Sequence, residues 1–263
     1  MLPLVFYFAL IYLPPAPSVS EMWAMYDEDT VEFQRVAKSR VNSGQWKRLT
    51  PGTLPPVGAL VFAFGTRAAR SLSPASARVV EVFVGGRTPL VSGHDILPWE
   101  PPVQAVTELA TFLRVRHPAR PICVVSGPRT QAWAQEVVDA MPPARVVNVP
   151  DLPKALAFVS QLYADPSNCT AVVLAADFEV LDFPVVQKLL QLQIRAGIPL
   201  VGRTRHEVLF GAVAAVEPYR EDWVFPPQVP ADARIFMNGA IWRFLKLPKA
   251  NVSKRWEPLT LGN

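Results

Sequence analysis

The sequence predicts an α/β protein in which two doubly wound lobes of parallel sheet are joined by a hinge. Apolar runs such as 59–64 and 78–84 are continuous rather than alternating, which is typical of parallel strands buried on both faces. Helical patterns of about 10–15 residues separate the later apolar runs, and this alternation indicates βαβ units. The strands are too many for one mononucleotide-binding unit, and their number is natural for two lobes.

Local patterns place the elements in order along the chain. A helix is expected over 30–41, where apolar residues recur among charged ones at helical spacing and Asn42, Ser43 and Gly44 follow. Strands over 59–64 and 78–84 come next, and glycine follows each of them. The second half alternates helices over 102–117, 131–141, 152–164 and 183–196 with strands over 122–125, 145–149, 171–175, 199–201 and 212–216.

Two stretches rich in proline and glycine, 91–102 and 217–230, are the expected joints between the lobes. We therefore expect an N-terminal lobe made of 21–100 and 231–263, and a C-terminal lobe made of 101–230. The chain after residue 230 returns to the first lobe in this arrangement.

The first 20 residues have the pattern of an export signal. Residues 2–13 are apolar apart from two tyrosines, and this run is shorter than the roughly 20 residues that a membrane-spanning helix needs. Small residues between 16 and 20 offer cleavage positions, although no Lys or Arg precedes the apolar run. We expect a periplasmic or otherwise exported protein. A buried amino-terminal strand is the alternative.

The two cysteines, Cys123 and Cys169, each stand at the start of an apolar, strand-like run. Two buried free thiols are the simpler interpretation, because a free cysteine behaves as a small apolar residue. One disulfide is the alternative, which sequence spacing alone does not decide.

Composition and motifs exclude several functions. The net charge is +4, but no run of five like charges occurs, so no nucleic-acid partner is expected. Neither glycine-rich phosphate-binding motif is present, and the three histidines lie far apart, so we expect no cofactor and no metal. Ser126 lacks the preceding glycine of a nucleophile elbow. The protein is therefore not expected to be an enzyme, and an α/β enzyme using Ser126 or Asp177 is kept as an alternative.

Polar residues follow several of the predicted strands. In open α/β sheets, ligands bind beyond the carboxyl ends of the strands, where helix amino termini present free N–H groups. An acidic stretch before the first helix adds one more position. The expected ligand-binding residues are Asp27, Thr66, Ser126, Arg129, Thr130, Asp177, Arg203 and Thr204.

Five of these residues have an expected role and a simpler alternative. Asp27 and Asp177 are expected to receive an ammonium group, and Arg203 a carboxylate, together with the helix starts at Thr66 and Thr130. Alternatively, the two threonines cap helices and Asp27 places negative charge at a helix start. Asp177 would then cap the next helix, and Arg203 would pair with a nearby acid.

Several segments resemble one family of transport proteins. The stretch 198–216, IPLVGRTRHEVLFGAVAAV, is similar to a segment of ABC-transporter substrate-binding proteins of the tryptophan/tyrosine uptake type. The run 235–248 resembles that family's closing segment, and 63–69 and 125–132 resemble its glycine turns. The resemblance implies a type I periplasmic-binding fold, with three crossing strands and a ligand clamped between the lobes.

The expected function is that of an exported solute-binding protein of an ABC-type system, which clamps a small, polar, amino-acid-like ligand. A membrane permease is the expected partner, and the protein is expected to be a monomer. The family's long helix after residue 216 is replaced by the proline-rich 217–230. This departure favours an alternative, in which a structural or interaction protein has kept the fold and lost the ligand.

Overall fold

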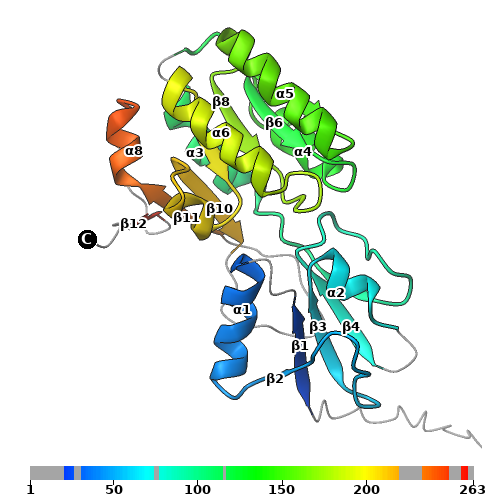
Figure 1. Cartoon of the computed structure of the whole chain (residues 1–263). Coiled ribbons are helices and arrows are strands. Elements are labelled where there is room, and N and C mark those ends of the chain that lie inside the picture. Colours follow the sequence, from blue (N-terminus) through cyan, green and yellow to red (C-terminus); the bar gives the residue numbers. More distant parts are fainter. Residues whose placement is uncertain are drawn as a thin grey trace, which may run out of the picture.

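Two sheets, one parallel throughout and one parallel except for a single antiparallel pair of strands, form two lobes in the computed structural model (Figure 1), and the buried apolar runs predict the parallel strands. The structure describes residues 21–26, 31–73, 77–114, 117–218, 233–248 and 256–259. Lobe 1 is built from the described residues up to 97, and lobe 2 from those after 102. Residues 98–102 connect the two lobes.

Lobe 1 contains a five-stranded parallel sheet in the order β2-β1-β3-β4-β5. Side chains of β3 alternate between the two faces, so that Phe62 and Phe64 join an aromatic core while Val61 packs on the opposite side. Phe62 stacks on Trp46 with ring centroids 4.4 Å apart. The elements are β1 (Met22–Tyr26), α1 (Val31–Asn42), β2 (Lys47–Arg48), β3 (Leu60–Phe64), α2 (Thr66–Arg70), β4 (Arg78–Val82) and β5 (Asp95–Leu97).

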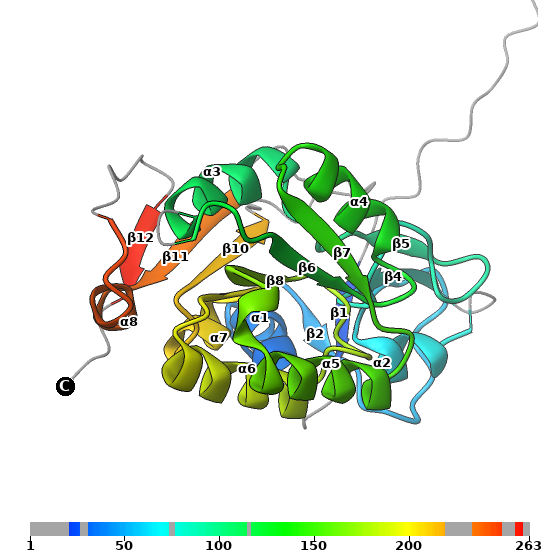
Figure 2. The same ribbon diagram turned by 90° about the horizontal axis from the view of Figure 1, so that it is seen from above.

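Lobe 2 contains a seven-stranded sheet in the order β12-β11-β10-β9-β8-β6-β7. Helices α3 and α4 cover one face and α5 and α6 the other (Figure 2), so the central strands are buried on both faces. The strands are β6 (Ile122–Ser126), β7 (Ala144–Asn148), β8 (Ala171–Leu174), β9 (Leu200–Gly202), β10 (Ala214–Pro218), β11 (Ala233–Asn238) and β12 (Trp256–Leu259). The helices are α3 (Val103–Leu113), α4 (Gln131–Asp139), α5 (Leu152–Ala164), α6 (Phe183–Ala196), α7 (Arg205–Leu209) and α8 (Gly239–Phe244), with a short 3₁₀ turn at Pro166–Asn168.

Helices α5 and α6 have the bounds that the sequence predicts, because both carry strong end signals. Asp151 caps α5 by accepting a hydrogen bond from the N–H of Lys154 at 2.8 Å. Asp182 caps α6, and Gly197 ends it in the left-handed conformation with φ of 69°.

The predicted return of residues 231–263 to lobe 1 is wrong for the described residues. Strand β11 pairs antiparallel with β10, with Val216 opposite Ile235, and β12 pairs with β11. Burial of Ile235 and Trp256 in the lobe 2 core holds both strands there. Of the three crossings implied by the family resemblance, one lies at 98–102. The expected signal segment 1–20 and the stretch 219–232 lie outside the described residues.

The two cysteines form a disulfide, so the simpler interpretation of two free thiols is wrong. Cys123 lies in β6 and Cys169 just before the neighbouring β8, and their Cα atoms are 5.8 Å apart. The bond ties together two adjacent strands whose sequence separation is 46 residues.

Candidate functional site

Loops that follow the strands of both sheets meet between the lobes, and we call this contact region the seam. From lobe 1 it includes the residues after β4, and from lobe 2 those after β6 and β8. Phe83 and Phe178, from opposite lobes, meet edge to face with centroids 5.2 Å apart. Phe83 adopts a positive φ of 60°, an uncommon conformation for a bulky residue, and its ring also contacts Trp99.

Arg129 crosses the seam from lobe 2. Its Nε donates to the carbonyl oxygens of Val84 at 3.0 Å and Gly85 at 3.1 Å, and its Nη2 donates to that of Thr88 at 2.5 Å. A β-carbon on Gly86 would lie 2.4 Å from the Arg129 carbonyl oxygen. Glycine at position 86 therefore allows the two backbones to approach.

Arg87 makes a second bridge across the seam. Its Nη1 and Nη2 each donate to the Glu136 carboxylate of α4 at 2.8 Å, and its Nε donates to Glu100 in the connection at 2.8 Å. The hydrogen bond with Glu136 raises the pKa of Arg87. Burial raises the pKa of the Glu100 carboxyl, and the neighbouring Arg87 opposes that shift.

Arg203 is held by its own lobe. Its guanidinium forms an ion pair with the Glu207 carboxylate, donates from Nη1 to the Asp177 carbonyl at 3.0 Å and lies over the Phe178 ring at 4.3 Å. Arg203 therefore pairs with a nearby acid, as the simpler alternative predicts. Glu207 occupies the place that was expected for the carboxylate of a ligand. Thr204 caps α7 by accepting from the N–H of Glu207 at 3.3 Å.

Asp177 also makes local contacts. It is 1% exposed, and its Oδ1 accepts a hydrogen bond from the N–H of Val180 at 3.1 Å. A β-carbon on Gly127 would lie only 1.9 Å from the Asp177 Oδ2. The carboxylate thus fixes the turn after β8 and touches the glycine turn after β6.

A groove of about 370 Å³ lies at the carboxyl ends of β6, β7 and β8, beside the seam, and we call it the seam groove. Glu179 in its wall lies 3.6 Å from Arg70 of lobe 1, so that both this pair and Arg129 connect the groove to the other lobe. Its lining residues are Pro128, Arg129, Pro150, Asp151, Leu152, Asp177, Glu179 and Val180.

The seam groove combines predicted and unpredicted residues. Arg129 and Asp177 were expected at the site. Asp151 and Glu179 were not, although Asp151 follows a predicted strand and the same strand-end rule points to it. Neither Asp151 nor Glu179 belongs to one of the sequence motifs considered above.

Ser126, Thr130 and Thr66, three further predicted residues, do not line the seam groove. Ser126 is fully buried, and its hydroxyl has no hydrogen-bond partner in the described part of the chain. Thr130 is buried, with its hydroxyl 3.4 Å from the Gly127 carbonyl oxygen. Thr66 is half-buried at the first position of α2. Asp27 lies outside the described residues.

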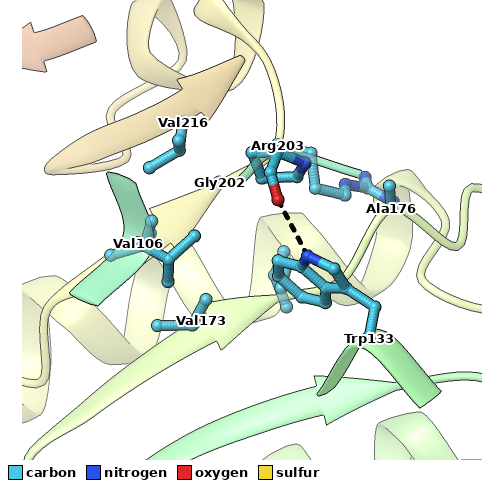
Figure 3. Close-up of a pocket in the computed structure, with 10 residues that line it drawn as sticks. Val106, Trp133, Val173, Ala176, Gly202, Arg203 and Val216 are labelled. Atoms are coloured by element: carbon cyan, nitrogen blue, oxygen red, sulfur yellow. Dashed lines mark hydrogen bonds between the residues drawn. The ribbon is translucent and has the colours of Figure 1, made fainter. Parts of the chain in front are cut away.

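A second, interior cavity has a volume of about 10 Å³, and Figure 3 draws the residues that line it. Apolar side chains line it, among them Val106, Val173 and Val216. The Trp133 Nε1 donates to the Pro101 carbonyl at 2.9 Å beside it. A cavity of this size holds about one water molecule and no solute.

Two further searches concern only the described ranges. No helix there is both long and apolar enough to cross a membrane. Across the same part of the chain, no three His, Cys, Asp or Glu side chains gather where they could hold a metal ion.

No family model and no curated protein matches the sequence. Several solved structures, in contrast, match its fold. An ABC domain in complex with L-Trp from Streptococcus pneumonia is 11% identical, with a TM-score of 0.59 over 87% of this chain and 96% of its own. A conserved domain protein from Vibrio cholerae is 14% identical, with a TM-score of 0.58 over 88% and 96%.

The ligand-free, open form of a substrate-binding protein with adhesive properties from Clostridium difficile is 12% identical, with a TM-score of 0.52 over 91% of this chain and 98% of its own. The chain has the type I periplasmic binding-protein fold. At these identities the likeness concerns the binding-protein fold alone. Of these three structures, one holds L-Trp and another is a substrate-binding protein.

Proposed function

We propose that the chain is an exported solute-binding protein of an ABC-type transport system, and that it holds a small, polar, amino-acid-like ligand between its lobes. The seam groove is the observation that carries the proposal. Its lining residues all belong to lobe 2, at the carboxyl ends of three parallel strands, where α/β sheets bind ligands. Arg70 of lobe 1 lies 3.6 Å from Glu179 in its wall, so lobe 1 stands beside the groove. The volume of about 370 Å³ is within the range of small-molecule sites.

The charges of the seam groove favour a ligand with an ammonium group. Its lining residues include three carboxylates, Asp151, Asp177 and Glu179, and one cation, Arg129. Arg129 is directed toward carbonyl oxygens of lobe 1. In the described part of the chain, the second carboxylate oxygen of Asp151 and of Asp177 accepts no hydrogen bond. An ammonium group would provide charge-assisted hydrogen bonds to these oxygens.

The proposed transport role adds a membrane permease as partner and an exported location. The apolar run 2–13 supports export. One chain supplies both lobes, so that ligand binding needs no second copy. Closure of the lobes over the ligand would present the surface that the permease recognises.

A thermal-unfolding screen of amino acids, other amines, sugars and purines tests the proposal. A compound at about 100 times its Kd should raise the free energy of unfolding by about 2.7 kcal/mol. We expect the active compounds to carry an ammonium group, and Glu179→Gln and Asp151→Asn to weaken their effect. Asparagine also caps helices well, so the second variant keeps α5 intact.

Asp139→Asn is the matched control, because Asp139 is an exposed acid on α4 outside the seam groove. It should leave the stabilisation unchanged. A panel in which no compound raises the unfolding temperature would contradict the proposal. So would a stabilisation that all three variants weaken equally.

The direct contacts across the seam favour a second candidate, an interaction protein that kept the fold and binds no solute. Arg129 and Arg87 bridge the lobes, and Phe83 of lobe 1 meets Phe178 of lobe 2. Under this candidate the lobes stay together in every condition and no small molecule stabilises the protein.

A further inference from the structure

Glu81 places a carboxylate in the apolar interior of lobe 1. It lies in β4 between Val80 and Val82, and it is 0% exposed. A buried carboxylate costs free energy unless hydrogen-bond donors surround it. The donors around Glu81 therefore show what this side chain does in the fold.

Three donors meet the Glu81 carboxylate, and all of them belong to residues 90–94, just before β5. Its Oε2 accepts a hydrogen bond from the N–H of Leu90 at 2.5 Å, and its Oε1 accepts one from the N–H of Val91 at 2.8 Å. The Nδ1 of His94, a fully buried side chain, lies 3.0 Å from Oε1. In the described residues the His94 Nε2 has no hydrogen-bond partner. Glu81 thus ties residues 90–94 to β4, and we call these three contacts the Glu81 anchor.

The anchor closes the segment of lobe 1 that meets lobe 2. Residues 83–89, which we call the seam loop, run from the end of β4 to the anchor. A β-carbon on Gly85 would lie 3.2 Å from the Ala176 carbonyl oxygen of lobe 2. The seam loop also carries the carbonyl groups that bind Arg129, and Arg87, which binds Glu136. One segment therefore makes both arginine bridges and is held at both of its ends.

The shape of the seam loop decides whether lobe 2 can bind it. The single guanidinium of Arg129 donates to the carbonyl oxygens of residues 84, 85 and 88, so these oxygens must converge on one group. A loop with a released end samples more conformations, and ordering it around the guanidinium costs conformational entropy. The anchor lowers that cost, because it orders the loop before the lobes meet.

We propose that Glu81 and His94 are positioning residues for the seam, which hold the seam loop in the shape that Arg129 and Arg87 bind and so set how readily the two lobes separate. Their contacts act within lobe 1, and their effect reaches lobe 2 through the loop. In a solute-binding protein, a consequence that rests on the proposed function, a weaker anchor makes the lobes open more easily.

A double-mutant cycle in urea, without any added compound, tests the link between the anchor and Arg129. Glu81→Gln keeps the size of the side chain and puts an amide nitrogen, which donates, in place of an oxygen that accepts. Arg129→Ala should raise the equilibrium constant for unfolding by a factor at least about threefold smaller in Glu81→Gln than in the wild type, because the loosened loop binds Arg129 less well. The same factor in both backgrounds would overturn the proposal.

Arg114 provides the matched control for this cycle. Its guanidinium also donates to three backbone carbonyl oxygens, but all three, at residues 141–143, lie within lobe 2. Arg114→Ala should raise the unfolding constant by the same factor with and without Glu81→Gln. Coupling of Glu81 to Arg114 as large as its coupling to Arg129 would show a general effect on stability and would refute a role at the seam.

His94→Gln takes the place of Glu81→Gln if the latter does not fold. It leaves both backbone hydrogen bonds of Glu81 in place and removes only the imidazole from the anchor. Its coupling to Arg129 should be smaller, at least about twofold, and its coupling to Arg114 absent. Equal coupling to the two arginines, or none to either, would count against the proposal as before.

Hydrogen exchange of the folded protein locates the effect. In the anchor variants, amides at 84–88 and at 126–130, across the seam, should exchange at least about threefold faster than in the wild type, relative to those of α6. Val79→Ala is the control, because it removes methyl groups from the same strand and from the apolar cluster on which Leu90 packs. It should leave the relative exchange at 126–130 unchanged.

Unchanged exchange at 126–130 in the anchor variants, or equal acceleration by Val79→Ala, would confine the role of Glu81 to lobe 1 and overturn the proposal. Both experiments use the protein without any compound. Their outcome is therefore independent of the compound screen that tests the proposed function.

Discussion

The carboxylate of Asp177 occupies the space in which a side chain at position 127 would stand. Its Oδ2 lies 1.9 Å from the point where a β-carbon on Gly127 would be. The turns after β6 and β8 therefore fit together only because residue 127 has no side chain. The same contact holds one wall of the seam groove, which contains Asp177 and the neighbouring Pro128.

Gly127→Ala should destabilise the protein by roughly 1–3 kcal/mol, because the added methyl displaces a buried carboxylate. Denaturant unfolding of the variant measures this loss. In an Asp177→Ala background the methyl meets no carboxylate, and the cost of Gly127→Ala should fall. An equal loss of stability from Gly127→Ala in the wild-type and Asp177→Ala backgrounds would contradict the contact between Asp177 and residue 127.

Arg129→Ala should lower the free energy of unfolding by roughly 1.5–3 kcal/mol, since it removes the charged hydrogen bonds to Val84, Gly85 and Thr88. Urea unfolding of the two proteins gives this difference. Arg243→Ala, at an exposed arginine on α8, is the control and should change stability little. Similar losses for the two arginines would argue against Arg129 as a bridge across the seam.

Glu100 should make the stability depend on pH. Burial raises the pKa of its carboxyl in the folded protein above the ordinary value. The folded state therefore binds the proton more strongly than the unfolded state, and this stabilisation is present below the ordinary pKa and lost as pH rises through the folded pKa. Glu100→Gln does not titrate and should lose less stability than the wild type as pH rises from about 4 to about 7.

Unfolding curves at each pH measure the difference between wild type and Glu100→Gln. Arg87 keeps its bond with Glu136 in the variant, which limits the change to the buried carboxyl. A difference that is constant over the range, or that changes in the opposite direction, would refute the effect of burial on Glu100.

Removing the disulfide should cost about 4 kcal/mol in the chain-entropy description, because Cys123 and Cys169 are 46 residues apart. The variant with both cysteines changed to alanine, compared with the wild type in denaturant, measures this cost. An unchanged midpoint with and without reductant would show that the two sulfurs are not bonded in solution.

The sequence predicts the parts of the fold that local signals control. Helices α5 and α6 begin at Asp151 and Asp182 caps, and their bounds agree with the prediction. The lobe assignment after residue 230 depends on the antiparallel pairing of β11 with β10. These two strands are consecutive in the chain, but the proline-rich stretch between them has the composition of a joint between lobes, so the local pattern does not indicate that they pair. The disulfide likewise depends on the adjacency of β6 and β8.

At the candidate site, the sequence predicts positions better than contacts. Strand-end reasoning finds Arg129 and Asp177, which line the seam groove. The prediction leaves open which nearby acid pairs with Arg203, and the structure shows that it is Glu207, in the helix that Thr204 caps. The contact of Asp177 with Gly127 depends on how two turns approach, and no spacing in the sequence encodes it.

Small-angle X-ray scattering of protein that has been unfolded, dialysed and refolded tests the central claim most directly. If the chain is a solute-binding protein, the refolded, ligand-free protein should have a larger radius of gyration than the same protein after an active ammonium-bearing compound is added. Glu179→Gln should require more of the compound. The same radius of gyration with and without every compound would contradict ligand-driven closure and would favour an interaction protein with permanently joined lobes.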